Sequence, residues 1–206
     1  VVCRRQRQMC IRDSGGSDDE RTLNRNTEAF DDCDLVPKIL ANVGKPDLST
    51  TVFGRKISMP IFLSPAAMQR LYHPEGDKAS ARAAEKFNTF YSMSTMSNNS
   101  IEQIANLSSG PKLFQLYIHK DQSITDDLID RCKRANFDGL CLTVDTIVAG
   151  NRERDHRTGF TTPPKLTLKS LFSFAIKPKW VFDYLTNEKF ELCLLYTSPS
   201  PRDGLL

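Results

Sequence analysis

The sequence predicts an α/β fold in which helices cover a parallel sheet, because segments typical of strands and of helices alternate along it. Short apolar segments rich in strand-forming residues occupy residues 60–64, 89–94, 113–118 and 139–145. Segments with helical periodicity lie between them, at residues 77–88, 100–107 and 123–136. Short connections between such elements are typical of either an open, doubly wound sheet or a closed barrel.

Two further elements are expected before this alternation begins. Residues 18–34 predict a helix, since Leu23, Thr27 and Phe30 share one face and carboxylates in the first turn suit the helix dipole. Residues 51–58 predict a short hairpin, because strand-forming residues flank Gly54 and Arg55.

The segment 139–145 is expected to be a buried strand. Its apolar run, which is too short for a helix, consists of Leu140, Cys141, Leu142 and Val144. Cys141 is accordingly expected to be a buried, unreactive thiol. A complete (β/α)8 barrel needs about 250 residues, so a barrel interpretation leaves this chain with only about four β/α units.

Polar side chains gather at the carboxyl ends of the predicted strands. Gln115 and Tyr117 are two residues apart, as are Thr143 and Asp145, so each pair points to one face of its strand. In a barrel such faces converge on one concave site. Amides and hydroxyls there can bind the edge of a planar heterocycle, and an arginine can hold a carboxylate. Solvated strand ends, or a polar plug inside the barrel, are the alternative interpretations.

The two ends of the sequence are expected to be translated sequencing-adaptor DNA. Codons that encode residues 9–14 have a reverse complement that encodes residues 193–197 when it is read one frame over. Unrelated ends of a gene have no reason to be reverse complements. We therefore expect residues 1–14 and 193–206 to be adaptor-like, and residues 15–192 to be the authentic chain.

Charge and composition exclude several classes of function. The two ends carry five of the 28 basic residues and two of the 25 acidic ones, so the remainder is electrically balanced. Nothing therefore indicates a nucleic-acid partner or an anionic membrane. Cys33, Cys132 and Cys141 lack the spacing of a metal site and are interpreted as reduced thiols, so no metal is expected. No glycine-rich phosphate loop and no apolar run of membrane-spanning length is present.

Five motifs carry a resemblance to one family. They are, in order, GGSDDERTL (15–23), PIFLSPAAMQRLYHPEGD (60–77), STMSNNSIEQIA (94–105), FQLYIHKD (114–121) and LTVDTIVAGNRERDHRTGF (142–160). Together they resemble the FMN-dependent L-2-hydroxy-acid oxidases and dehydrogenases, such as glycolate oxidase and cytochrome-type L-lactate dehydrogenase. The resemblance covers nearly all of residues 15–192. It implies the first half of a TIM (β/α)8 barrel, preceded by a helix and a short hairpin.

The resemblance also implies roles for individual residues. The residues that would contact FMN are Pro65, Ala66, Ala67, Ser94, Gln115 and Thr143. Tyr117 would contact the substrate oxygen, and Arg152 would bind the substrate carboxylate. Asp145 would orient a catalytic histidine and stabilise its protonated form.

The implied activity is oxidation of a small L-2-hydroxy acid to the 2-oxo acid, with the electrons passing to FMN. Residues 161–192 look most like the lactate dehydrogenase branch, which favours a lactate-like substrate. The implied final electron acceptor is a cytochrome, a quinone or oxygen, and the full-length protein is expected to be a homo-oligomer. A cytochrome-linked enzyme would be mitochondrial, and an oxidase would be peroxisomal.

The sequence departs from the family in two places. The family's substrate-binding tyrosine aligns with Arg12, inside the adaptor-like end. The family's catalytic histidine, flavin-contacting lysine, second substrate arginine and phosphate-binding loops belong to the second half of the barrel. The histidines present do not replace the catalytic one, since we expect His73 to be structural and His119 and His156 to be solvated. The alternative to an active enzyme is therefore an inactive, truncated half-barrel.

Overall fold

The computed structural model describes residues 15–40, 44–144, 150–158, 178, 182, 186 and 192–196. The chain divides into two compact units. The first comprises Val1–Pro46 and Val148–Phe182, and the second comprises Asp47–Ile147 and Asp183–Leu206. The predicted strands all belong to the second unit, whereas Arg152 belongs to the first, so the predicted site residues are divided between the two.

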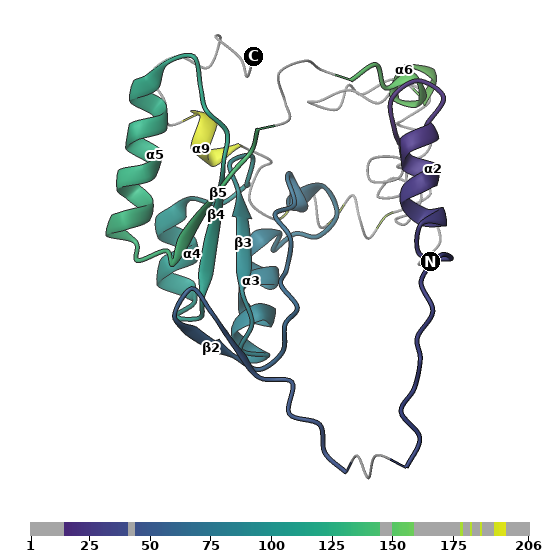
Figure 1. Cartoon of the computed structure of the whole chain (residues 1–206). Coiled ribbons are helices and arrows are strands. Elements are labelled where there is room, and N and C mark those ends of the chain that lie inside the picture. Colours follow the sequence, from purple (N-terminus) through teal and green to yellow (C-terminus); the bar gives the residue numbers. More distant parts are fainter. Residues whose placement is uncertain are drawn as a thin grey trace. The chain divides into compact units, whose positions relative to one another are not determined.

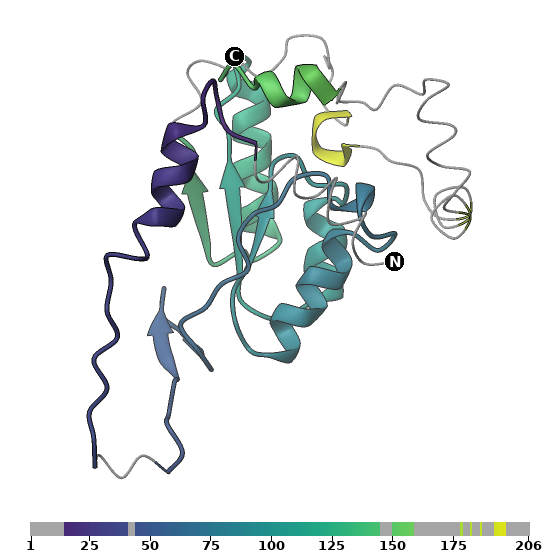
Figure 2. The same cartoon turned by 90° about the vertical axis from the view of Figure 1, so that its right-hand side faces the viewer.

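A parallel sheet forms the centre of the second unit (Figures 1 and 2). Its strands are, in spatial order, β3 (Tyr91–Ser94), β4 (Lys112–Leu116) and β5 (Gly139–Leu142). Ser94 pairs with Gln115, which in turn pairs with Cys141. The predicted first strand contributes only a parallel bridge between Leu63 and Tyr91. The predicted parallel α/β arrangement is therefore confirmed, with a shorter first strand.

Helices precede and connect these strands, and capping side chains set the start of two of them. The helices are α3 (Asp77–Lys86), α4 (Ile101–Leu107) and α5 (Gln122–Arg134). Ser100 caps α4, because Ser100 and Gln103 each accept a hydrogen bond from the other's backbone N–H. Asp121 caps α5 by accepting from the N–H of Ser123 over 3.0 Å. Such caps satisfy N–H groups that a helix otherwise leaves unpaired.

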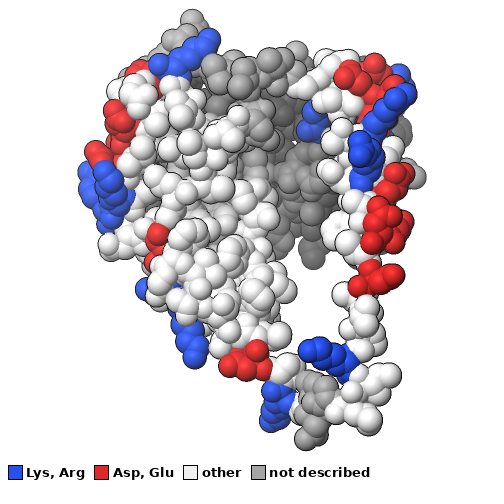
Figure 3. Space-filling model, in the orientation of Figure 1, with Lys and Arg blue, Asp and Glu red and all other residues white. Residues whose placement is uncertain are grey.

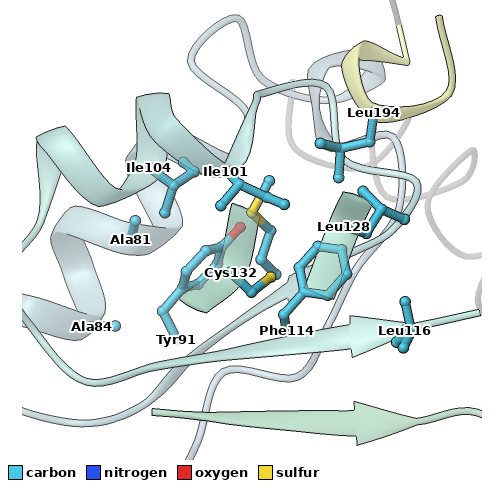
Figure 4. Close-up of a cluster of buried hydrophobic side chains, with 11 residues drawn as sticks. Ala81, Ala84, Tyr91, Ile101, Ile104, Phe114, Leu116, Leu128, Cys132 and Leu194 are labelled. Atoms are coloured by element: carbon cyan, nitrogen blue, oxygen red, sulfur yellow. The ribbon is translucent and has the colours of Figure 1, made fainter. Parts of the chain in front are cut away.

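The helices and the sheet share one apolar core (Figure 4). Its buried members are Ala81, Ala84, Tyr91, Met93, Ile101, Ile104, Phe114, Leu116, Leu128, Cys132 and Leu194. Leu194 comes from α9 (Cys193–Tyr196) and is only 2% exposed. Burial of a large apolar side chain contributes about 1.5–3 kcal/mol, so this core is the main force that holds α3, α4 and α5 against the sheet.

The predicted hairpin is also present. It consists of β1 (Thr50–Val52) and β2 (Arg55–Ile57), which pair antiparallel. Its two turn residues, Phe53 and Gly54, have φ values of 49° and 74°, the left-handed backbone that a two-residue hairpin turn needs. Ile57 packs against Phe90 and Leu113 in a second buried cluster. The hairpin is therefore anchored beside the starts of β3 and β4.

The first unit contains α2 (Arg21–Glu28) and α6 (Glu153–Thr158). α2 is shorter than the helix predicted over residues 18–34, and none of its residues is buried. Phe30 lies beyond its end and is 79% exposed, so the apolar face expected from Leu23, Thr27 and Phe30 does not form. Periodicity alone does not bury a helix face; another element must pack against it.

β5 is the least covered strand of the sheet. Leu140, Leu142 and Val144 are 46%, 50% and 75% exposed, and Cys141 is exposed as well. The prediction of a buried strand with a buried Cys141 thiol is therefore wrong. Within the described part of the chain β5 pairs only with β4, so nothing covers its other edge.

Charged side chains gather on helices α2, α5 and α6, while the middle of the face shown in Figure 3 is largely uncharged. The uncharged area agrees with the exposed apolar side chains of β5. Among the described helices, none is both long enough and apolar enough to cross a membrane.

Candidate functional site at the strand ends

Three polar side chains meet at the carboxyl ends of neighbouring strands. Ser94 Oγ donates a hydrogen bond to Gln115 Oε1 over 3.1 Å, and Gln115 Nε2 donates to Thr143 Oγ1 over 2.5 Å. Ser94 ends β3, Gln115 lies in β4, and Thr143 directly follows β5. The parallel register therefore places Ser94, Gln115 and Thr143 side by side, and we refer to these three residues as the strand-end row.

The strand-end row is buried and is held by the backbone around it. Ser94 and Gln115 are 4% and 6% exposed, and Thr143 is half-buried. Ser94 Oγ accepts from the N–H of Met96 over 3.1 Å. The N–H of Thr95 donates to the backbone carbonyl of Gln115 over 3.1 Å. Because Oε1 and Nε2 of Gln115 both form hydrogen bonds, the orientation of this amide relative to the three strands is fixed.

The strand-end row keeps hydrogen-bonding capacity for a ligand. Gln115 Nε2 carries two hydrogens and gives one to Thr143, whose hydroxyl accepts that bond and retains its own hydrogen. No acceptor for these two remaining hydrogens is found among residues 15–40, 44–144, 150–158 and the few others that the structure describes. Hydrogens of the amide and the hydroxyl that find no acceptor among these residues are available to a bound ligand. The row therefore suits a ligand that presents carbonyl oxygens, as the edge of a planar heterocycle does.

The predicted cofactor-lining loop lies directly after the bridge residue of the first strand. It consists of Pro65, Ala66 and Ala67. Pro65 is exposed, and the two alanines are half-buried. The next residue, Met68, has a φ of 56°, and its N–H donates to the carbonyl of Met96 over 3.1 Å. The loop is thus tied to the chain that leaves the end of β3, two residues beyond Ser94.

A buried carboxylate, which sequence reasoning missed, also holds this loop. Asp77 is fully buried although it is the first residue of α3. Its Oδ1 accepts from Tyr91 Oη over 2.9 Å and from Gln69 Nε2 over 3.2 Å, and its Oδ2 accepts from the N–H of Asn98 over 3.2 Å. Gln69 Nε2 in turn donates to the carbonyl of Ala66 over 3.3 Å. Asp77 therefore connects β3 with the cofactor-lining loop.

The environment of Asp77 shifts the titration of two groups. Burial raises the pKa of Asp77 above its ordinary value, although hydrogen bonds from Tyr91, Ser97 and the Asn98 backbone act in the opposite direction. Burial and the neighbouring Asp77 carboxylate raise the pKa of Tyr91 well above its ordinary value. An acid at the start of a helix is ordinarily explained by the helix dipole. The sequence therefore carries no separate signal for this network.

The other predicted site residues are placed differently. Tyr117 follows β4, is half-buried, and donates its backbone N–H to Thr95 Oγ1 over 3.2 Å. Arg152 is half-buried and lies in the first unit, immediately before α6. Asp145 lies outside the described residues. The strand-end row is thus the part of the predicted site that the structure brings together.

The three histidines do not supply a base beside the strand-end row. His73 is exposed, and its Nδ1 accepts from the N–H of Glu75 over 3.3 Å, which agrees with a structural role in the turn. His156 is exposed in α6. His119 is only 8% exposed, so its prediction as a solvated residue is wrong. Burial lowers the pKa of His119, and the backbone N–H of His119 donates a hydrogen bond to Thr125 Oγ1 over 3.1 Å.

Cys132 is the buried thiol of the apolar core. Burial raises the pKa of Cys132 to about 12, which keeps this thiol protonated and unreactive at neutral pH. Within the described part of the chain, no group of three or more histidine, cysteine or acidic side chains has the arrangement of a metal site.

Comparison with known proteins identifies relatives along most of the chain. The family model described as FMN-dependent dehydrogenase matches residues 6–200. Glycolate oxidase 1 of Oryza sativa subsp. indica is 45% identical over 157 residues, which are 76% of this chain and 42% of the rice enzyme. The chain therefore spans less than half the length of the curated relatives that it matches.

Solved structures give the same relationship. A lactate oxidase of Pediococcus acidilactici superposes with a TM-score of 0.69 at 39% identity, over 79% of this chain and 45% of the oxidase. A monotopic membrane protein, (S)-mandelate dehydrogenase, superposes with a TM-score of 0.85 at 31% identity, over 93% of this chain and 52% of the dehydrogenase. Both identities are high enough for the relationship to concern the family as well as the fold.

Proposed function

The chain belongs to the FMN-dependent dehydrogenase family, and we propose that the intact protein oxidises a small L-2-hydroxy acid to the 2-oxo acid. The fold of this chain is the first half of the family's (β/α)8 barrel, with the sheet edge at β5 exposed. The observation that carries the proposal is the strand-end row, in which the buried Ser94 and Gln115 and the half-buried Thr143 are hydrogen-bonded at the carboxyl ends of parallel strands. Catalytic sites of such barrels are built at that end.

The residues present fit FMN. The two uncommitted hydrogens of the strand-end row, on Gln115 Nε2 and on the Thr143 hydroxyl, suit the carbonyl oxygens at the pyrimidine edge of the flavin. The half-buried Ala66 and Ala67 offer a small, apolar surface with backbone groups nearby, on which a flat ring can lie. When bound, FMN takes up the two electrons that leave the substrate.

We assign the substrate contacts to Tyr117 and Arg152. The Tyr117 hydroxyl donates a hydrogen bond to a substrate oxygen, and the Arg152 guanidinium binds the carboxylate with parallel hydrogen bonds. Asp145 orients the histidine that removes a proton from the substrate and stabilises that histidine once it is protonated. The resemblance places the histidine in the second half of the barrel, so the present chain supplies its carboxylate partner.

The proposed substrate is lactate-like. Residues 161–192 resemble the lactate dehydrogenase branch, and the matched structures include a lactate oxidase. Glycolate oxidases and mandelate enzymes are relatives of comparable similarity, so glycolate and (S)-mandelate are the competing substrates to compare. The final electron acceptor would be a cytochrome, a quinone or oxygen.

The decisive experiment uses the full-length enzyme. We expect purified protein to carry FMN and its flavin absorbance to bleach when L-lactate is added without oxygen, more rapidly than with glycolate or (S)-mandelate. Arg152→Met is expected to raise KM by about 100-fold, since loss of a charged hydrogen-bonded partner costs about 2–3 kcal/mol. A protein without bound flavin, or one that no 2-hydroxy acid bleaches, contradicts the proposed function.

We also propose that residues 15–192 are the authentic part of the chain. The support is the reverse-complement relation between the codons for residues 9–14 and those for residues 193–197. Sequencing the genomic locus across both junctions tests it. A genomic reading frame that continues unchanged through residues 14 and 193 contradicts the adaptor origin.

A further inference from the structure

Two segments far apart in the sequence are joined in the first unit. The N–H of Asp18 donates to the carbonyl of Asn151 over 2.9 Å, and Asn151 Nδ2 donates to Asp18 Oδ1 over 2.9 Å. The two residues thus exchange hydrogen bonds across 133 positions of the chain. α2 and α6 follow these two residues in the sequence and are drawn near each other in Figure 1.

An ion pair and a close approach strengthen this junction. Arg154 Nη2 lies 2.5 Å from Glu20 Oε2, and the Glu20 side chain is only 18% exposed. The other Glu20 oxygen accepts from the N–H of Gly16 over 3.1 Å, which holds the carboxylate in place. A Cβ at Gly150 would overlap with Ser17 Oγ, so the Ser17 hydroxyl would have to turn away to admit a larger residue at position 150.

All the anchored positions surround one residue. Gly150 and Asn151 precede Arg152, and Arg154 follows it by two positions. The helix that begins after Arg152 has only six residues, which is too short to be stable without tertiary contacts. We propose that residues 16–20 form a clasp that positions Arg152, with Asp18 and Glu20 as positioning residues. This inference rests on the proposed role of Arg152 in binding the substrate carboxylate.

A fixed arginine binds a carboxylate better than a mobile one. Two parallel hydrogen bonds require the guanidinium plane and the carboxylate plane to coincide, and ordering a loose segment at the moment of binding lowers affinity. The clasp orders the segment before substrate arrives. Because Asp18 and Glu20 would act on binding alone, their loss is expected to change KM more than kcat.

The test measures kcat and KM for L-lactate in the full-length holoenzyme. Asp18→Ala is expected to raise KM about tenfold, corresponding to the ordering of one or two side chains, with kcat changed less than about twofold. Asp19→Ala is the matched control, because Asp19 is an exposed neighbour that forms no hydrogen bond or ion pair with another described residue. Asn151→Asp is also expected to raise KM, since it places two carboxylates together.

Exchange of the two side chains provides the rescue. Adding Asp18→Asn to Asn151→Asp restores one donor and one acceptor in reverse order, so KM is expected to return to within about threefold of the native value. A structural defect alone would lower the melting temperature, but KM would not rise in the single variants and return in the exchanged pair. If Asp18→Ala does not fold, Glu20→Gln weakens the ion pair with Arg154 at nearly constant volume and is expected to raise KM about threefold.

Equal effects of Asp18→Ala and Asp19→Ala, or failure of the exchanged pair to lower KM, overturn the clasp. The Arg152→Met variant separates this outcome from failure of the proposed function. If Arg152→Met leaves KM unchanged, the assignment of Arg152 as the substrate arginine is wrong. If Arg152→Met raises KM while Asp18→Ala and Glu20→Gln do not, the substrate assignment holds and the clasp is wrong.

Discussion

Two regions of the molecule use carboxylates to hold a loop that carries predicted site residues, and their environments are opposite. In the second unit, Asp77 is fully buried and connects β3 with the loop that contains Ala66. In the first unit, Asp18 is exposed and Glu20 is partly exposed, and they bond to the segment that carries Arg152. The same chemical group thus does a similar task in the interior and at the surface.

The difference lies in what happens when the carboxylate is removed. In the interior, the Tyr91 hydroxyl and the Asn98 N–H cannot turn to water, so loss of Asp77 leaves both groups buried and unsatisfied. At the surface, water replaces the lost partner, and the ion pair is weakened by solvent screening. Burial, rather than the number of hydrogen bonds, therefore determines how much stability a carboxylate contributes. The predictions below test this contrast in the full-length protein.

The largest effect is expected for Asp77→Ala. The change leaves the Tyr91 hydroxyl and the Asn98 N–H buried without an acceptor, which lowers the free energy of unfolding by about 3 kcal/mol or more. Urea denaturation measures the loss. Asp77→Asn keeps an acceptor oxygen and nearly the same volume, so it is expected to cost less. An equal, small effect of both variants would contradict the importance of burial.

The raised pKa of Asp77 gives its contribution to stability a defined pH dependence. Since its ordinary value is 3.8 and burial raises the folded-state pKa, the folded protein keeps this proton at pH values at which the unfolded chain has released it. The contribution is therefore full below pH 3.8 and declines as pH rises through the folded-state pKa. Asp77→Asn is expected to remove this decline of stability with pH. Melting temperatures of both proteins, measured across the same pH range, test this.

An intermediate effect is expected for the pair that joins α4 and α5. Arg131 donates to both oxygens of Glu102 over 2.7 and 2.8 Å, and its side chain is 13% exposed against 50% for Glu102. The Arg131 hydrogen bond lowers the pKa of Glu102 from 4.5 to about 2. Solvent screening limits the stabilisation to about 1 kcal/mol.

Glu102→Gln is accordingly expected to lower the free energy of unfolding by about 1 kcal/mol at pH 7. Because the folded-state pKa is depressed, this stabilisation is full above pH 4.5 and is lost as pH falls through about 2. The difference in the free energy of unfolding between native protein and variant should disappear once the pH has fallen through about 2. A difference that persists at the lowest pH would show that the pair is not electrostatic in origin.

The smallest effect on stability is expected for Glu20→Gln in the clasp. The ion pair with Arg154 is partly exposed, so its loss costs about 0.5 kcal/mol. Raising the salt concentration from 0.05 to about 0.5 M is expected to reduce the difference between native protein and variant further, since the Debye length then falls to a few ångströms. A large, salt-independent loss of stability in thermal melts would show that Glu20 stabilises the fold as strongly as the buried Asp77 does.

Much of the fold was predictable because its signals are local. The helix expected over residues 100–107 forms as α4, with Ser100 and Gln103 three positions apart as its cap, and the turn at Gly54 closes the predicted hairpin. A helix cap or a two-residue turn needs only neighbours in the chain. By contrast, the burial of His119 and the exposure of Cys141 were predicted wrongly, since both depend on which distant element covers the residue.

The candidate site shows the same division. Ser94, Gln115 and Thr143 were each predicted to lie at strand ends, and the register of three parallel strands brings them into contact. Asp77 was not recognised, because two of its partners, Tyr91 and Asn98, lie 14 and 21 positions away. The roles of all the predicted site residues, among them Asp145 and Arg152, stay predictions.

The sequence by itself determined the alternation of strands and helices, the polar residue types at the strand ends and the family, because these depend on local periodicity and on motifs. Only the tertiary structure decided which polar groups meet. Strand register forms the strand-end row, the interior places three hydrogen-bonding segments around Asp77, and a junction across 133 positions joins Asp18 to Asn151. Local conformational preferences extend over a few residues, whereas contacts at such separations form only when the whole unit packs.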